Sequence, residues 1–169
     1  MEELQRRIVA KDFLDGTGDQ RRLGTQERHL PGMAQQRQEP VTGRVDSRFM
    51  GDGWETRRRR EPGHDWAVLR LGRPGTIDEI EVDTAHFRGN FPDRVSLQAA
   101  LIDNIATEAL ENASATWPLL LPEQPMRADH QHKFKTELVR LGPVSHVRLN
   151  LHPDGGVSRL RLYGSSVHK

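Results

Sequence analysis

The segment from Gly51 to Trp66 holds the chain's densest group of side chains that could do chemistry. It contains four consecutive arginines, Arg57–Arg60, and several proton-carrying groups, among them Glu55, His64 and Asp65. Guanidinium groups bind carboxylates through paired hydrogen bonds, whereas carboxyl and imidazole groups donate and accept protons. The segment therefore has the mixture of groups that a small anionic, hydrogen-bonding ligand requires.

Simpler interpretations of the same segment remain open at this point. A run of four arginines more often forms a solvated turn, or a patch that touches nucleic acid, than an active site. Trp54 and Trp66 are more often packing residues than partners that stack on a ligand. The formal net charge of +1, with acids interleaved beside the arginines, argues against a nucleic-acid partner.

A second group of candidates stands in Glu81–Asp93, which reads EVDTAHFRGNFPD. A strand that ends at Asp83 and enters a turn through His86 would place a carboxylate and an imidazole at the mouth of the strand, where sites on rigid scaffolds tend to lie. Spacing alone favours a plainer outcome, in which Asp83 and Thr84 bond to turn amides and His86 is exposed.

The other histidines give weaker signals. His130 and His132 are two residues apart, so on a strand they would share a face and could hold a metal. No obvious third ligand follows nearby, so we predict no metal and no cofactor. His146 and His152 flank a predicted strand, and we expect them at the surface or at a sheet edge.

Absent residues and motifs exclude several classes of site. The chain has no cysteine, which excludes disulfides, thiolate metal sites and cysteine nucleophiles. The motifs G-x-S-x-G, H-E-x-x-H, G-x-G-x-x-G and the P-loop are also absent. Neither a signal-peptide core nor a run of about 18 apolar residues is present, so we expect a cytoplasmic protein without a membrane partner.

The elements that must position these groups are indicated by apolar residues with period two, bounded by Gly, Pro, Asp and Asn. Five strands are predicted in this way, around Trp66–Leu71, Ile80–Val82, Val95–Leu101, Val147–Leu151 and Leu160–Leu162. We expect the last two to form a β-hairpin around the turn Pro153–Gly156, and a helix or long loop over 104–115. The absence of a repeated strand–helix alternation favours an antiparallel β-sandwich.

The first 42 residues differ from the rest. Apolar side chains four apart allow a short helix over Glu2–Leu14, and 15–42 have too little to bury and are expected to be disordered. The low hydrophobic fraction of 34% agrees with a thin sandwich that carries such an extension.

Three blocks of the chain resemble the allantoicase family. They are 50–66, 81–93 and 142–164, the last reading GPVSHVRLNLHPDGGVSRLRLYG, and they stand in the family's order. The resemblance covers 43–164 and implies a jelly-roll sandwich of the galactose-binding-like type. The implied plan is an extension over 1–42, one allantoicase repeat over 43–164 and a tail over 165–169.

The resemblance also implies a reaction, in which a hydrolase of C–N bonds in linear amidines converts allantoate and water to ureidoglycolate and urea. Such a site needs an arginine for the carboxylate, a general acid for the leaving nitrogen and a base. Within the matching blocks these roles fall to Arg57 or Arg58 as the carboxylate clamp and to Asp83, His86 and Glu55 as catalytic candidates. His64, Asp65 and Trp54 would bind or orient the substrate.

The family usually carries two repeats in tandem, and this chain has one, which is most similar to the C-terminal copy. We therefore expect a second repeat or a homo-oligomer. The family's opening strand is not visible before Met50, and a missing strand would expose a sheet edge. The alternative function is a catalytically inactive module that binds a small ligand or a protein, because this sandwich architecture serves many functions.

Overall fold

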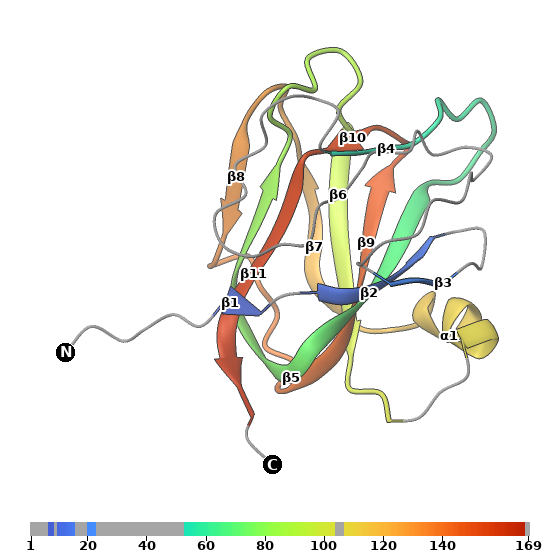
Figure 1. Ribbon diagram of the computed structural model, residues 1–169. Helices are drawn as coiled ribbons and strands as arrows, with labels where there is room; N and C mark the ends of the chain where they lie inside the picture. The colour runs from blue at the N-terminus through green and yellow to red at the C-terminus, as the bar shows by residue number, and fades with distance from the viewer. Residues whose placement is uncertain (1–6, 9, 16–19, 23–52, 104–106, 168–169) are drawn as a thin grey trace.

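The computed structural model describes residues 7–8, 10–15, 20–22, 53–103 and 107–167. In these residues the chain forms antiparallel strands and the helix α1 (Thr107–Ser114) (Figure 1). The strands are β1 (Arg7–Ile8), β2 (Ala10–Asp15), β3 (Gln20–Arg22), β4 (Trp54–Glu55), β5 (Asp65–Asp83), β6 (Arg94–Ala100), β7 (Leu119–Pro125), β8 (Gln131–Phe134), β9 (Val144–His152), β10 (Gly156–Val157) and β11 (Arg159–Ser166). The predicted all-β antiparallel sandwich is confirmed.

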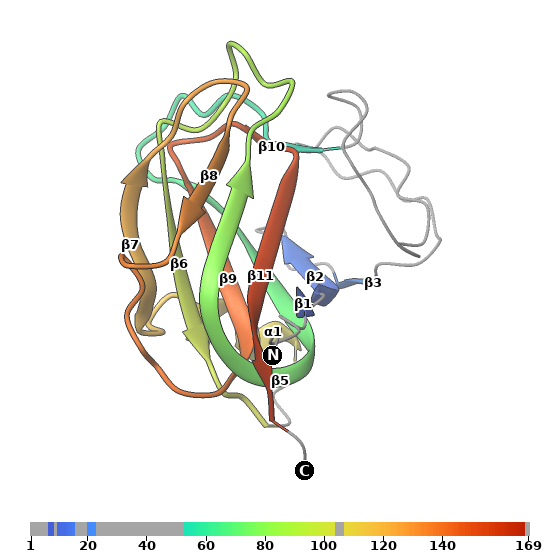
Figure 2. The same ribbon diagram turned by 90° about the vertical axis from the view of Figure 1, so that its left-hand side faces the viewer.

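The long strand β5 joins the two layers of the sandwich. Its first half pairs with β9 and β2, and its second half pairs with β11 and β8. A register irregularity between Arg70 and Gly75 separates the halves. In Figure 2 the strand turns at the lower end of the molecule and continues in the other layer. The first layer thus runs β7–β6–β9–β5, and the second runs β8–β5–β11–β1.

Alternation along the strands fills the space between the layers. The first layer contributes apolar side chains from β5, β6 and β9, and the second contributes them from β5, β8 and β11. The buried set includes Leu69, Leu97, Val147, Leu149, Ile80, Val82, Phe134 and Leu162. Removal of these side chains from water is the main term that stabilises the fold.

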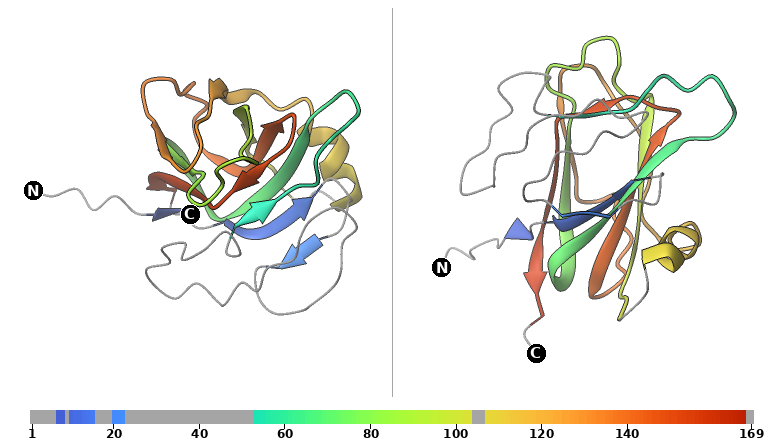
Figure 3. Two further views of the ribbon diagram at one scale, coloured as in Figure 1. Left: turned by 90° about the horizontal axis from the view of Figure 1, so that it is seen from above. Right: turned by 45° about the vertical axis from the view of Figure 1, so that its right-hand side comes forward.

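The strand β9 is covered on both faces, since each residue of Val144–Leu151 is buried. One face meets the core, and on the other side a second apolar group forms from Val68, Leu110 and Trp117, with Trp66 packed against it. Figure 3 shows α1 outside the sandwich, beside the first layer. The polar residues of β9 therefore lie under other parts of the chain rather than in open solvent.

Two of the sequence-based expectations about strands are wrong. Trp66–Leu71 and Ile80–Val82 are not separate strands, because both belong to β5. The strands β9 and β11 do not form a hairpin with each other: β9 pairs with β5 and β6, whereas β11 pairs with β5 and β1. Period two identifies a strand with one buried face, but it does not identify the neighbour that the strand pairs with.

The short helix expected over Glu2–Leu14 is also not found. The described residues there form β1 and β2, and β2 pairs with the first half of β5. Backbone pairing along a sheet edge overrides the weak local helical pattern. Most of the expected disordered segment lies outside the described residues, as do Gly51 and Asp52. The helix or loop expected over 104–115 is confirmed as α1.

Among the described residues, no helix combines the length and apolar character that a membrane crossing needs.

The contact between β11 and β5 gives a test of the fold. Gly164 faces the Thr76 backbone so closely that an added Cβ would overlap the Thr76 carbonyl oxygen. We expect Gly164→Ala to lower the free energy of unfolding by about 1–3 kcal/mol, because a strand backbone cannot move aside cheaply. Urea denaturation measures this change. Gly89→Ala is the matched control, since a Cβ added there would have nothing within 4 Å; equal midpoints for the two variants would contradict the packing.

Candidate functional site

Two of the predicted segments meet at one end of the sandwich. The strand β4 pairs with β10, which places Glu55 opposite Gly156. The Glu55 carboxylate accepts a hydrogen bond from the Asn90 side-chain amide, and the Gly156 N–H donates to the Asn90 carbonyl at 2.6 Å. Both segments lie at the upper end of the molecule in Figure 1. Parts of the chain that are 35 residues apart are thus joined at Glu55.

The turn 153–156 connects the same end to the loop after β4. The Gly155 N–H donates to Thr56 Oγ1 at 3.0 Å, and the Arg59 N–H donates to Asp154 Oδ2 at 2.7 Å. Gly155 has a φ of +136°, and an added Cβ would overlap the Pro92 backbone. Only glycine combines this φ with so close an approach.

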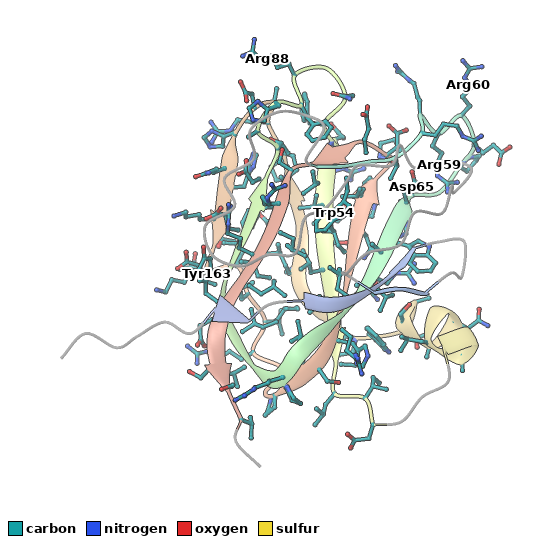
Figure 4. The ribbon with its side chains drawn as sticks, viewed as in Figure 1. Trp54, Arg59, Arg60, Asp65, Arg88 and Tyr163 are labelled. Atoms are coloured by element: carbon teal, nitrogen blue, oxygen red, sulfur yellow. The ribbon has the colours of Figure 1, made fainter. Side chains whose placement is uncertain are left out.

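The four arginines of the run Arg57–Arg60 differ in their contacts. Arg59 holds Asp65 through two nitrogens, with Nη2 at 3.0 Å and Nε at 3.1 Å from Oδ1. Arg57 and Arg58 are exposed, and Figure 4 shows Arg60 pointing away from the protein while Arg59 lies beside Asp65. Asp65 is thus fixed by Arg59 at the start of β5. Trp54, the predicted substrate contact, packs against the hydrophobic core.

Asp83 lies on the outer face of the second layer. Its side chain is buried and accepts hydrogen bonds from the Ala85 N–H at 2.8 Å and from Gln131 Nε2 at 3.2 Å. Arg161 Nη1 lies 3.6 Å from the same carboxylate and also pairs with Glu81. The bond from the Ala85 N–H is the turn contact that the plainer sequence interpretation expected, whereas the contacts with β8 and β11 were not predicted.

His86 is exposed and has a φ of +72°. Its N–H donates to Asp129 Oδ1 at 2.8 Å, and Arg88 Nε lies 3.3 Å from the other oxygen of that carboxylate. The His86 amide is the largest of the causes that lower the pKa of Asp129. The described contacts of the His86 backbone are therefore with the 127–130 segment.

His130 and His132 come as close as their spacing predicts, with ring centroids 4.8 Å apart. His132 is buried, and its ring nitrogens contact the Arg127 N–H at 2.9 Å and the Val82 carbonyl at 3.2 Å. Burial is the main cause that lowers its pKa. Within the described ranges, no group of three or more His, Asp or Glu side chains has an arrangement suited to a metal ion.

The sequence analysis did not find a polar cluster on the outer face of the first layer. We call it the outer-face cluster; it comprises His64, Trp66, Ser96, Gln98, Ser114, Arg148, Asn150 and His152. At its centre the Arg148 guanidinium lies over the Trp66 ring, 4.1 Å from the centroid. Arg148 Nε donates to Asn150 Oδ1 at 2.9 Å, and Nη1 donates to Ser114 Oγ at 2.8 Å. Arg148 is only 6% exposed.

Asn150 connects the arginine to the two histidines. Its Oδ1 lies 3.2 Å from His64 Nε2, and its Nδ2 donates to Ser96 Oγ at 3.2 Å and to Gln98 Oε1 at 3.1 Å. Ser96 Oγ in turn lies 3.1 Å from His152 Nε2. Because Asn150 Oδ1 is an acceptor, His64 Nε2 donates to it, as Arg148 does.

Burial and the neighbouring charges lower the pKa of both rings. Burial is the largest cause that lowers the pKa of His64; the Asn150 hydrogen bond raises it, and the charges of Arg148 and Arg59 lower it further. Burial also lowers the pKa of His152, and the neighbouring His64, 4.6 Å away between ring centroids, adds to the effect. The cluster therefore combines one buried cation with two imidazoles that favour the neutral form.

In the sequence, the alternating polar residues of β9 are the feature that indicates this cluster. Arg148, Asn150 and His152 share one face of the strand, and sequence analysis assigned His152 to the surface or an edge. His152 is 15% exposed at its side chain, and His146, placed in the same way, is buried. Only the packing of α1 and Trp117 on this side shows that the polar face is covered.

Comparison with known proteins identifies the family. A family model described as the allantoicase repeat matches residues 28–167. The chain belongs to the allantoicase family. It is 64% identical over 115 residues to a protein named probable allantoicase 2 from Burkholderia pseudomallei, a match that covers 68% of the chain and 34% of that relative. A probable allantoicase from Ralstonia nicotianae is 61% identical over 116 residues, with coverage of 69% and 34%.

A solved structure supports the same assignment. The crystal structure of allantoicase from Saccharomyces cerevisiae aligns with a TM-score of 0.58 and 39% identity, and covers 75% of this chain and 35% of that one. The resemblance predicted from three sequence blocks is confirmed, and the family match begins earlier than the predicted residue 43. The chain spans about a third of the length of the allantoicases it matches.

The lowered pKa values of His64, His132 and His152 predict a pH-dependent stability. The unfolded chain takes up protons near pH 6.5, whereas the folded chain does so only at lower pH, so the unfolded state binds more protons in between. We expect the free energy of unfolding to fall as the pH drops from about 7 through this window. Urea denaturation at a series of pH values measures it.

The double variant His64→Gln and His152→Gln should make this fall less steep, because two of the three groups no longer titrate. His86→Gln removes an exposed histidine outside these three groups and serves as the control. An equally steep fall in the double variant would mean that the two rings are not held neutral in the folded state.

Proposed function

We propose that this chain is a repeat of an allantoicase, which hydrolyses allantoate to ureidoglycolate and urea. Relatives at 61–64% identity that carry the name probable allantoicase support this function. The structural observation that carries the proposal is the hydrogen bond between Glu55 and Asn90, which joins the first two family-like segments at one end of the sandwich. Asp65, held by Arg59, lies next to His64 at the start of β5.

The reaction sets the roles that the site must fill. The central carbon of allantoate carries a carboxylate and two ureido groups, and one C–N bond to a ureido nitrogen breaks. A general acid protonates that nitrogen so that urea leaves, and the N–H proton of the other ureido group goes to a base as a C=N bond forms. Water then adds to this carbon, and the product is ureidoglycolate.

Glu55 is the carboxyl group best placed for proton transfer in this proposal. It is half-buried at the meeting point of the two segments, and the Asn90 amide fixes its orientation. Arg57 and Arg58 are exposed on the adjoining loop and would attract the anionic substrate. His86, on its exposed turn, stays a proposed proton carrier, and His64, on the outer face, stays a proposed substrate-binding or orienting group.

Asp83 has a positioning role in this proposal. Its carboxylate is buried and already bonded to Ala85 and Gln131, and its backbone carbonyl accepts from the Ser158 N–H at 2.7 Å. These contacts tie the end of β5 to the turn that follows it, to β8 and to the residue before β11. Asp83 would thus keep the Asn90 segment in place without touching the substrate.

The assembly around the repeat is part of the proposal. Since the chain spans about a third of its relatives, a second repeat or another copy of the chain would accompany it. A cytoplasmic location and the absence of nucleic-acid and membrane partners agree with the chain's lack of cysteine and its net charge of +1.

Urea release from allantoate tests the function. We expect the chain to release urea and ureidoglycolate in equal amounts, and Glu55→Gln to lower kcat by about 100-fold with a smaller change in KM. Glu137→Gln, in an exposed carboxyl group after β8, should leave kcat unchanged.

Binding of allantoate without any urea release would instead support the inactive binding module. An unchanged kcat in Glu55→Gln would remove Glu55 from the proton-transfer step while leaving the family assignment intact.

A further inference from the structure

Two turns of the chain are joined by hydrogen bonds beyond the end of β5 and the start of β8. The first turn, 84–88, follows β5, and the second, 127–130, precedes β8. The Thr84 N–H donates to the His130 carbonyl at 2.9 Å, and the Thr84 hydroxyl donates to the Arg127 carbonyl at 2.6 Å. Thr84 is fully buried. The two turns, which are about 40 residues apart in the chain, therefore form one unit.

Asp129 contacts three successive residues of the first turn. Its Oδ1 accepts the His86 N–H at 2.8 Å, and its Oδ2 lies 3.3 Å from Arg88 Nε. Its own N–H donates to the Phe87 carbonyl at 3.1 Å. Arg88, which Figure 4 shows at the upper end of the molecule, is 82% exposed at its side chain. An ion pair so open to solvent stabilises the fold little, so the main effect of the Asp129 carboxylate is on the geometry of the turn.

The backbone conformation of this pair is unusual. Among the described residues other than glycine, those with a positive φ are His86, at +72°, and Asp129, at +50°. Residues with a Cβ rarely adopt this conformation, and it persists where surrounding contacts hold it in place. Here the two residues bond directly to each other. The conformation of His86 is therefore maintained by its contact with Asp129.

The residue after His86 fixes the turn on its other side. The Phe87 ring is fully buried, and a Cβ added at Gly156 would overlap it. Gly156 lies opposite Glu55 in the pairing of β10 with β4. The backbone of His86 thus has a defined position relative to the strand that carries Glu55.

We infer that Asp129 is a positioning residue for the hydrolysis, which orients the His86 imidazole by holding the backbone of its turn. The inference rests on the proposed function, in which His86 carries a proton. Proton transfer requires the donor and the acceptor to lie within hydrogen-bond reach, so a small displacement of the imidazole slows the reaction. Asp129 lies outside the three blocks of the chain that resemble the allantoicase family, and it acts without touching the substrate.

Substitutions at Asp129 separate the carboxylate from the backbone conformation. Glycine and asparagine both tolerate a positive φ, but only asparagine keeps an oxygen that can accept the His86 N–H. We expect Asp129→Gly to lower kcat for urea release from allantoate by about tenfold or more with little change in KM, and Asp129→Asn to retain most of the activity. Asp103→Gly, at an exposed aspartate after β6, is the matched control and should leave kcat unchanged.

A double variant shows whether Asp129 acts through His86. His86→Asn removes the imidazole and keeps a residue that tolerates a positive φ. If the two residues act as a unit, Asp129→Gly lowers kcat no further in the His86→Asn background. An equal loss of kcat in both backgrounds would show a general structural effect of Asp129 and would overturn the inference.

Amide hydrogen exchange reports on the same contact without substrate. The His86 N–H donates to Asp129 on an exposed turn, so we expect it to exchange faster in Asp129→Gly than in Asp129→Asn. The Thr84 amide, which donates to the His130 carbonyl, should exchange equally slowly in both variants and shows that each is folded.

Two results would contradict the positioning role directly. They are equal exchange of the His86 amide in the two variants, and a kcat of Asp129→Gly equal to that of the unaltered chain. Failure of the proposed function is distinguishable, because the unaltered chain would then release no urea from allantoate, and the role of Asp129 in catalysis would fall with it.

Discussion

The pairing of β5 with strands of both layers is the constraint on which the rest of the structure depends. One strand of 19 residues supplies a partner for β9 in the first layer and for β11 in the second. Its two ends thereby set the positions of His64 and Asp65 at one point and of Asp83 at another. Since side chains alternate across a strand, this pairing also decides which residues face the core and which face outward.

The two outer faces use their polar residues differently. On the second layer, Glu81 and Asp83 are balanced by Arg161, and Lys133 lies 3.8 Å from Glu81, so opposite charges stabilise each other. On the first layer, Arg148 is surrounded by an indole, an amide and a hydroxyl. Burying a charge is costly unless its hydrogen bonds are made, and the amide and the hydroxyl accept two of them here. Burial is the main cause that lowers the pKa of His64, and the charge of Arg148 adds to it.

The segment before β5, which resembles the allantoicase family, contributes side chains to two parts of the sandwich. Glu55 lies at the end of the sandwich beside Asn90, whereas His64 lies on the outer face beside Asn150. Arg59 connects them, because its backbone bonds to Asp154 and its side chain holds Asp65. The dense chemistry seen in this short stretch is thus spread around one edge of the sandwich.

The sequence by itself determined the family and the antiparallel strands, because these depend on residue types and on local periodicity. Tertiary structure alone decided that β9 and β11 belong to different layers, that Asp83 faces Arg161, and that Arg148 and Asn150 lie buried beside His64. Those facts depend on which strands pair and on what covers each face. Such contacts join residues far apart in the chain, 86 positions in the case of His64 and Asn150, and no local pattern specifies them.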